Sequence, residues 1–206
     1  DTIISNIQRK NFRISILKDL SIRRLGLLRG KSLKSQLSKI LENKTFHDTV
    51  CKLSINAVDL FSGDEFVFSS EGLHKKNSGH ITRKRFRIFD AISASMAIPM
   101  IFEPYTESGL MLADGGILNP LAIDLVNTKR YDIVIVVQTN GSLNYINKEK
   151  PNITEIMPQA ISVFQRKYIM PLILKKIEEE KNIIHIRLET KPVRPTKRNM
   201  KKAIEY

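Results

Sequence analysis

The chain has no tryptophan, a single cysteine and no long run of apolar residues. One cysteine, Cys51, excludes an internal disulfide, and its place at the start of an alternating segment predicts a small core residue. A helix that crosses a bilayer needs about 20 apolar residues in a row, and no stretch approaches that length. With 206 residues, 42% of them hydrophobic, the chain is long enough to fold as one domain around a sizeable core.

Several motifs that carry chemistry are also missing. The four histidines share no motif with one another or with the cysteine, so the sequence predicts no metal site, no cofactor and no histidine-containing triad. The stretch Gly26–Ser32 differs from a phosphate-binding loop, because three residues rather than four separate its glycines. Zinc-finger, helix-turn-helix and RNA-binding signatures are absent. The serine elbow G-x-S-x-G does not occur in these 206 residues.

Positive charge is what the chain has in excess. The net charge of +13 predicts an acidic partner, either anionic lipid or nucleic acid, unless it serves only solubility. The densest basic run, Arg83, Lys84, Arg85 and Arg87, surrounds Phe86 in a loop expected over residues 70–87. Such a run is typical of a membrane-facing rim, a nucleic-acid patch or a solvated loop. Because this loop leads directly into a helix of small residues, we favour a rim beside a substrate entrance.

Helical periodicity recurs along the chain. Helices are expected over residues 31–43, over residues 91–97 with Asp90 as the cap, and over residues 154–181. Pro171 should kink or divide the last of these. Residues 1–25 are basic and mixed, and a basic tail is expected from about residue 190.

Strand-like segments alternate with these helices, which favours an α/β protein. They cover residues 51–60, Glu65–Ser69, Leu110–Ala113, Asp132–Gln138 and 182–188. Ser62–Asp64 predicts a hairpin turn between the first two. The run Asp132–Gln138 is rich in β-branched residues, which predicts a parallel strand buried on both faces.

One stretch, Gly109–Pro120, holds the strongest candidate for a catalytic group. Its apolar residues predict a short strand that ends at Asp114, and Gly115 and Gly116 allow a sharp turn directly after it. Asn119 and the following proline then predict the start of a helix, with Asn119 as its N-cap. A partly buried carboxylate at such a strand end has a raised pKa and can act as a general base. An Asp-Gly-Gly sequence is also typical of a simple turn.

Together with a segment upstream, this stretch resembles the second half of the patatin-like phospholipase domain. In that family an A-x-x-A-S-x-A-x-P segment precedes a strand that ends in D-G-G or D-G-A, followed by x-x-N-P. The matching residues are Ala91, Ala94, Ser95, Ala97, Pro99, Asp114, Gly115, Gly116, Asn119 and Pro120. Gly30 before a helix, Ala57–Leu60 at a strand end and the strand at 132–137 match in the same order, so the resemblance runs from about Gly26 to about Gln138.

The resemblance implies a three-layer α/β/α fold with a mostly parallel central sheet, of which residues 1–206 are the C-terminal portion of one domain. It implies a Ser–Asp dyad without histidine, in which Asp114 is the base. The residues that shape the turn and the site are then Gly115, Gly116, Asn119, Ser95 and Pro99. The serine elbow and the glycine-rich oxyanion loop of such domains precede this region, and neither is in the chain. We therefore expect the chain to begin after them and to lack serine-hydrolase activity by itself.

The resemblance also implies a function for the full protein. It would be a lipid acyl hydrolase of the phospholipase A or lysophospholipase type, with phospholipids or lysophospholipids as substrates. An anionic membrane surface would be its other partner. The alternative is a catalytically inactive remnant that only binds acidic membranes. Nucleic-acid binding has charge alone in its favour and is not expected, and no cofactor is implied.

Overall fold

The computed structural model of the chain describes residues 26–28, 31–71, 86–139 and 153–188. The basic residues Arg83, Lys84 and Arg85, the segment 1–25 and the tail from residue 190 lie outside the described residues. The chain divides into two compact units, Asp1–Leu125 and Val126–Tyr206. Within the described ranges, every helix is too short or too polar to cross a membrane.

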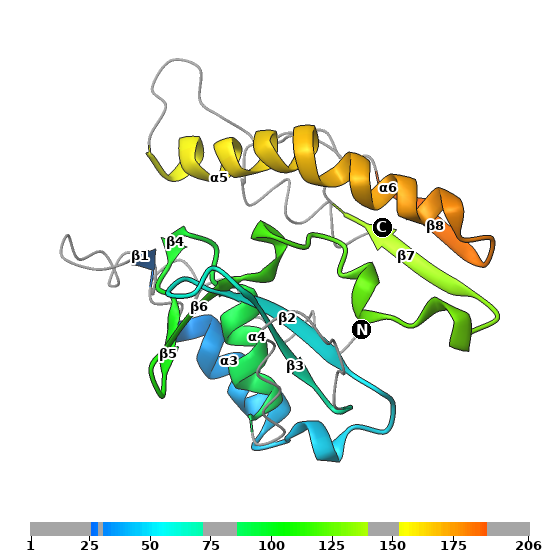
Figure 1. The fold of residues 1–206 in the computed structure, drawn as a ribbon. Coiled ribbons are helices and arrows are strands. Elements are labelled where there is room, and N and C mark those ends of the chain that lie inside the picture. The colour runs from blue at the N-terminus through cyan, green and yellow to red at the C-terminus, as the bar shows by residue number, and fades with distance from the viewer. Residues whose placement is uncertain (1–25, 29–30, 72–85, 140–152, 189–206) are drawn as a thin grey trace. The chain divides into compact units, whose positions relative to one another are not determined.

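A four-stranded antiparallel sheet in the order β3-β2-β6-β5 forms the centre of the first unit (Figure 1). Its strands are β2 (Ser54–Asp59), β3 (Glu65–Ser69), β5 (Tyr105–Glu107) and β6 (Leu110–Asp114). Tight turns explain the antiparallel pairing of β2 with β3 and of β5 with β6. Gly63 has a φ of 78° in the β2–β3 turn, and Ser108 and Gly109 have φ values of 51° and 81° between β5 and β6. Two consecutive positive φ angles are typical of a type I′ hairpin turn, whose twist matches that of the strands. The predicted hairpin and its return strand are confirmed.

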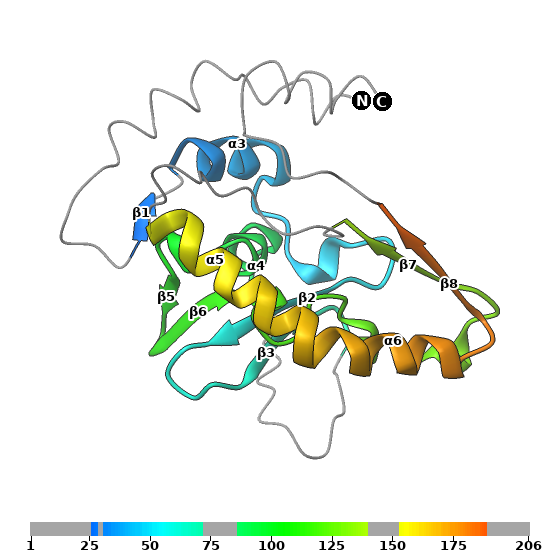
Figure 2. The same cartoon turned by 90° about the horizontal axis from the view of Figure 1, so that it is seen from above.

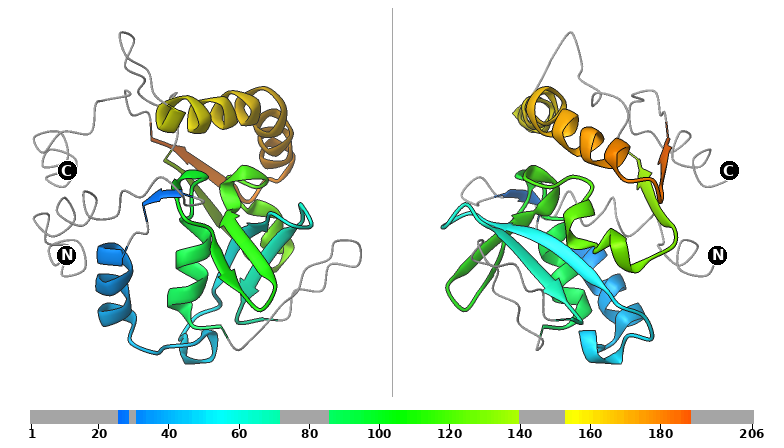
Figure 3. Two further views of the ribbon diagram at one scale, coloured as in Figure 1. Left: turned by 90° about the vertical axis from the view of Figure 1, so that its left-hand side faces the viewer. Right: turned by 45° about the vertical axis from the view of Figure 1, so that its right-hand side comes forward.

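Two helices stack on this sheet, one directly on the strands and the second on the first. Helix α4 (Ile88–Ser95) contacts β2 and β6, and α3 (Lys31–Leu41) contacts α4, so α4 lies between α3 and the sheet (Figure 3). Ala91 and Ala94 are fully buried, which lets the backbone of α4 approach the strands closely. The core beside them is aromatic: the ring of Phe68 meets that of Phe66 at 4.8 Å and that of Phe86 at 5.1 Å, both edge to face.

Short elements link these parts. Strand β1 (Gly26–Leu28) pairs in parallel with β4 (Met100–Phe102). Single 3-10 turns occur at η1 (Phe46–Asp48), η2 (Gly115–Ile117), η3 (Ile123–Leu125) and, in the second unit, η4 (Thr128–Arg130).

The second unit contains a parallel strand pair and a continuous helical rod (Figure 2). The strands are β7 (Val134–Gln138) and β8 (Ile183–Arg187). The rod consists of α5 (Ile153–Phe164), a π-helical turn η5 (Gln165–Ile169) and α6 (Met170–Glu179). Pro171 has no N–H for the carbonyl four residues earlier and its ring crowds that carbonyl, so the wider π turn relieves the clash. The predicted helix is thus present, and its regular α-helical geometry is interrupted directly before Pro171, but the rod is not divided there.

The fold is mixed α/β, but a parallel central sheet is not confirmed, since the largest sheet among the described strands is antiparallel. The prediction that Asp132–Gln138 is buried on both faces is wrong. Successive side chains of a strand point to opposite faces, and Ile135 and Val137 are exposed whereas Val134 and Val136 are buried. Only one face of β7 is therefore covered in the described structure.

Two local predictions are also wrong. Cys51 is exposed, because it lies in the bend before β2, which begins at Ser54, and so it is not a core residue. Asp90 does not cap the small-residue helix, because α4 begins earlier, at Ile88, with Arg87 as its N-cap residue. Asp90 instead lies in the first turn of α4, where Arg87 pairs with it.

Candidate active site

Asp114 ends β6, a strand hydrogen-bonded on both sides by β2 and β5. Its backbone N–H donates to the carbonyl of Ala97 at 3.0 Å, which ties it to the segment that follows α4. Its side chain accepts a hydrogen bond at Oδ1 from the Gly116 N–H at 2.8 Å. Among the described residues, Oδ2 accepts no hydrogen bond. One carboxylate oxygen is thus fixed by the turn, and the other is available to accept a proton.

Gly115 allows the turn to pass against β2. A Cβ atom at Gly115 would lie 2.5 Å from the backbone oxygen of Asn56 and 2.5 Å from its Cγ. Real Cβ atoms do not approach backbone so closely, so only glycine fits here without a shift. A Cβ at Gly116 would meet only Asp114 Oδ1, at 3.0 Å. The double glycine therefore holds the carboxylate close to the sheet, a requirement that a simple surface turn does not have.

Burial raises the pKa of Asp114, and the hydrogen bond from the Gly116 N–H lowers it less than burial raises it. The carboxylate is only partly buried, so it keeps access to a reaction partner. A carboxyl with a raised pKa holds a proton more readily than an exposed aspartate does. This is the property that a general base needs, because a very weak base cannot take a proton from a hydroxyl.

Four polar side chains form a hydrogen-bonded network that holds the residues following the Asp-Gly-Gly turn. We call it the polar brace, and it consists of Asn56, Glu65, Asn119 and Asp124. Asn56 Nδ2 donates to the carbonyl of Asn119 at 3.0 Å and to Glu65 Oε1 at 3.3 Å. Asn119 Nδ2 donates to Glu65 Oε1 at 2.9 Å and also to Asp124. The brace connects two strands with the segment after the turn, so it fixes where the turn leaves the sheet.

The brace includes Asn119, one of the residues expected to shape the turn, but the helix expected after Asn119 does not form. Asn119 Oδ1 does accept from the Ala122 N–H at 2.9 Å, as an N-cap residue would. Ala122 itself has a φ of 48°, in the left-handed region, which ends any helix at that point. Only the 3-10 turn η3 follows. The prediction of a helix start is therefore wrong, although the capping hydrogen bond is present.

Ser95 and Pro99 lie two residues before and two residues after Ala97, which accepts the hydrogen bond from the Asp114 N–H. Ser95 is the last residue of α4 and is half-buried, and Ala97 between them is buried with its carbonyl on the Asp114 N–H. The structure thus brings the small-residue segment and the Asp-Gly-Gly turn together. Among the described residues, no serine hydroxyl hydrogen-bonds to the Asp114 carboxylate. Ser93 is buried in α4, where its hydroxyl has no described partner.

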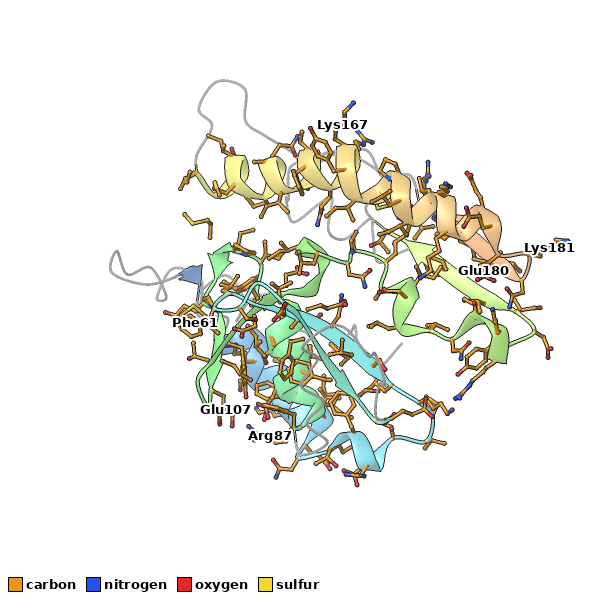
Figure 4. The ribbon with its side chains drawn as sticks, viewed as in Figure 1. Phe61, Arg87, Glu107, Lys167, Glu180 and Lys181 are labelled. Carbon is orange, nitrogen blue, oxygen red and sulfur yellow. The ribbon has the colours of Figure 1, made fainter. Side chains whose placement is uncertain are left out.

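Of the predicted basic rim, only Arg87 is described. Its Nε and Nη2 donate to the two carboxylate oxygens of Asp90 at 2.8 and 3.0 Å, and its guanidinium lies 5.7 Å from the ring centre of Phe89. The hydrogen bonds that Arg87 donates to Asp90 are the main reason that the pKa of Arg87 is raised. Figure 4 shows this residue at the edge of the first unit. Because Asp90 neutralises it, Arg87 has less charge to offer a membrane than the sequence suggests.

Sequence reasoning missed Asn56, Glu65 and Asp124. Asn56 directly precedes the Ala57–Leu60 segment, but a polar residue in an alternating strand gives no sign of what it will face. Within the described ranges, no three His, Cys, Asp or Glu side chains come together as metal ligands would. His185 lies on β8 in the second unit, where its Nε2 and the side-chain oxygen of Gln138 are 3.0 Å apart.

The raised pKa of Asp114 predicts how its removal changes stability. Between its ordinary and its raised pKa the folded chain binds more protons than the unfolded chain, so stability falls as pH rises through that window. Above the window, the full cost of burying a charge is present. Asp114→Asn keeps the Oδ1 acceptor without the charge, so its melting temperature should exceed that of the parent at about pH 7 and approach it at about pH 4.

Thermal melts followed by circular dichroism at both pH values check this. Asp64→Asn, in the exposed β2–β3 turn, is the control and should show no such pH-dependent gain. A variant less stable than the parent at about pH 7 would show that the Asp114 charge is compensated in the fold.

Comparisons with known proteins match the chain to one family profile and to several curated proteins. The sequence profile described as patatin-like phospholipase matches residues 1–126, which is the first compact unit and one further residue. Three mycobacterial proteins, one from Mycobacterium bovis and two from strains of Mycobacterium tuberculosis, are described as uncharacterized NTE family proteins. Each is 30% identical to this chain over 139 residues, which cover 67% of the chain and 34% of the relative. The matched region thus spans about a third of the length of these relatives.

Proposed function

Since the chain belongs to the patatin-like phospholipase family, we propose that it is the aspartate-bearing part of a lipid acyl hydrolase of the phospholipase A or lysophospholipase type. The observation that carries this proposal is the geometry of Asp114. Its carboxylate is partly buried at a strand end, one oxygen is held by the Gly116 N–H, and its pKa is raised. A general base of a Ser–Asp dyad needs these properties.

In the proposed reaction, Asp114 Oδ2 takes the proton from a serine hydroxyl while the serine oxygen attacks the carbonyl carbon of an acyl ester. The tetrahedral intermediate then breaks its bond to the alcohol, which leaves with that proton, and the acyl group stays on the serine. Water, deprotonated by the same carboxylate, attacks the acyl-enzyme and releases the fatty acid. The serine regains its proton from Asp114, which completes the cycle.

The serine of this dyad is proposed to lie outside these 206 residues. The sequence contains no G-x-S-x-G elbow, and the matched region is about a third of the length of the curated relatives. Residues that hold the oxyanion are proposed to lie outside it as well. In the natural protein, Gly115, Gly116 and Asn119 would fix the turn that carries Asp114, and Ser95 and Pro99 would shape the segment bonded to it.

The finer fold is proposed on the same basis. In the natural protein, β7 and β8 would belong to a larger, mostly parallel sheet of a three-layer α/β/α domain that includes residues 1–206. The exposed apolar side chains of Ile135 and Val137 support this, because an apolar strand face is normally covered. Phospholipids or lysophospholipids are the proposed substrates, and an anionic membrane is the proposed surface on which the protein binds them.

Fatty-acid release from a phospholipid and from its lysophospholipid tests this function. We expect the protein expressed from the complete natural reading frame to hydrolyse at least one of them, and the 206-residue chain to hydrolyse neither. Hydrolysis by the 206-residue chain at the rate of the longer protein would refute the proposed place of the serine. A longer protein that is folded but hydrolyses no acyl ester would favour the inactive, membrane-binding alternative.

A further inference from the structure

The helical rod of the second unit exposes an apolar stripe. We define the apolar stripe as Ile153, Ile156, Met157, Val163, Phe164, Tyr168 and Leu172, all of which are exposed. Phe164 is 56%, Tyr168 60% and Leu172 72% exposed, although each is a large side chain that proteins usually bury. Single exposed apolar residues are common, but a contiguous group marks an interaction site.

The π turn η5 helps to keep these side chains on one side of the rod. Residues three, four and seven apart share a face of an α-helix, which aligns Ile153 and Met157 with Phe164. In a regular α-helix, each further step of four residues would rotate the side chain around the axis. The wider turn at Gln165–Ile169 rotates each residue less, so Tyr168 and Leu172 stay in line. The rings of Phe164 and Tyr168 lie 5.1 Å apart, in agreement with this alignment.

Basic residues accompany the stripe, which indicates the chemistry of its partner. Arg166, Lys167, Lys175 and Lys176 are exposed, and Lys167 projects from the rod on the side away from β7 and β8 (Figure 4). The acidic residues of the rod lie toward its two ends, with Glu155 in the first turn and Glu178 and Glu179 in the last, where Lys175 Nζ is 4.0 Å from Glu179 Oε1. Along the middle of the rod, from residue 156 to residue 177, the charged residues are all basic. A helix with large apolar residues on one face and basic residues beside them is typical of a segment that lies in the interface of an anionic bilayer. A second copy of the chain would instead bring these cations together.

We propose that the apolar stripe of α5, η5 and α6 docks on an anionic lipid bilayer, with its apolar side chains at the boundary between headgroups and acyl chains. The inference rests on the proposed function in that it names the surface through which a lipid acyl hydrolase would meet its membrane. It differs from the basic rim at Arg83–Arg87, which lies in the first unit.

The absence of tryptophan from the chain gives a direct test. Phe164→Trp places one fluorophore in the apolar stripe, and Phe61→Trp, at an exposed position of the β2–β3 turn, is the matched control. The vesicles consist of phosphatidylcholine with or without phosphatidylserine, as ether lipids that cannot be hydrolysed. We expect the emission of Phe164→Trp to shift to shorter wavelength with phosphatidylserine vesicles and to be quenched when the alkyl chains of these ether lipids are brominated. The Phe61→Trp emission should stay unchanged. Leu172→Trp is a second probe of the stripe.

Sedimentation with the same vesicles measures the strength of docking. Phe164→Gln combined with Leu172→Gln should weaken partitioning at least about tenfold, because two large apolar side chains are no longer transferred from water into the bilayer. Phe61→Gln should not weaken it. Binding without a shift at residues 164 and 172 would overturn the proposal and assign adsorption to basic segments elsewhere. A shift without vesicles that grows with protein concentration would overturn it in favour of a second copy. No step of this test depends on catalysis, so its outcome is separate from that of the hydrolysis assay.

Discussion

Asp114→Asn in the protein expressed from the complete natural reading frame is expected to lower kcat for acyl ester hydrolysis by about 10³-fold, the effect of removing a general base. The asparagine keeps the Oδ1 acceptor for the Gly116 N–H, so the turn is preserved. What the variant loses is the basic oxygen, Oδ2, because an amide nitrogen in its place cannot accept a proton from a serine. KM should change little, since the carboxylate acts on the nucleophile and not on the bound lipid.

Asp64→Asn is the matched control for this kinetic comparison. It makes the same chemical change in an exposed turn of the first unit and should keep the parental kcat. The stability measurement at about pH 7 separates catalysis from folding, because Asp114→Asn is expected to be at least as stable as the parent. A stable Asp114→Asn variant with undiminished kcat would remove Asp114 from the mechanism.

Gly115→Ala should be the most damaging small substitution in the site. Its methyl group would lie 2.5 Å from the backbone oxygen and from the Cγ of Asn56, so the turn must move away from β2. Overpacking of this kind costs about 1–3 kcal/mol. For a chain of this size, each kcal/mol lowers the melting temperature by roughly 2–4 °C. Because the displaced turn carries Asp114, kcat should fall as well.

Gly63→Ala distinguishes a loss of stability from a loss of kcat caused by displacement of Asp114. An added Cβ there meets nothing within 4 Å, but the residue has a φ of 78°. The substitution should therefore cost about 1–2 kcal/mol through backbone strain and leave kcat unchanged. A Gly115→Ala protein with parental melting temperature and parental kcat would show that the close approach of the turn to β2 is not required.

The sequence predicted the local elements around the site well. The strand that ends at Asp114, the β2–β3 hairpin and the helix that begins at Lys31 all lie where periodicity and turn residues placed them. Each of these features is decided within a few neighbouring residues. The π turn directly before Pro171 has an equally local cause, since proline acts on the turn that precedes it.

Features that depend on distant parts of the chain could not be predicted in this way. The bond from Asn56 to Asn119 joins residues 63 positions apart, and no local pattern indicates it. The exposure of one face of β7 depends on what covers it, which composition does not report. The helix expected at Asn119 failed because Ala122 adopts a left-handed conformation, an unusual choice for alanine that local preference would not select.

Fluorophosphonate labelling of the complete natural protein tests whether Asp114 is paired with a serine from outside this 206-residue stretch. The probe forms a covalent adduct with an activated serine, and peptide mapping locates that serine. We predict one labelled serine within a G-x-S-x-G sequence outside these residues, and loss of labelling in Asp114→Asn. An adduct on Ser93 or Ser95, or labelling that persists unchanged in the variant, would contradict the proposed pairing of Asp114 with that serine.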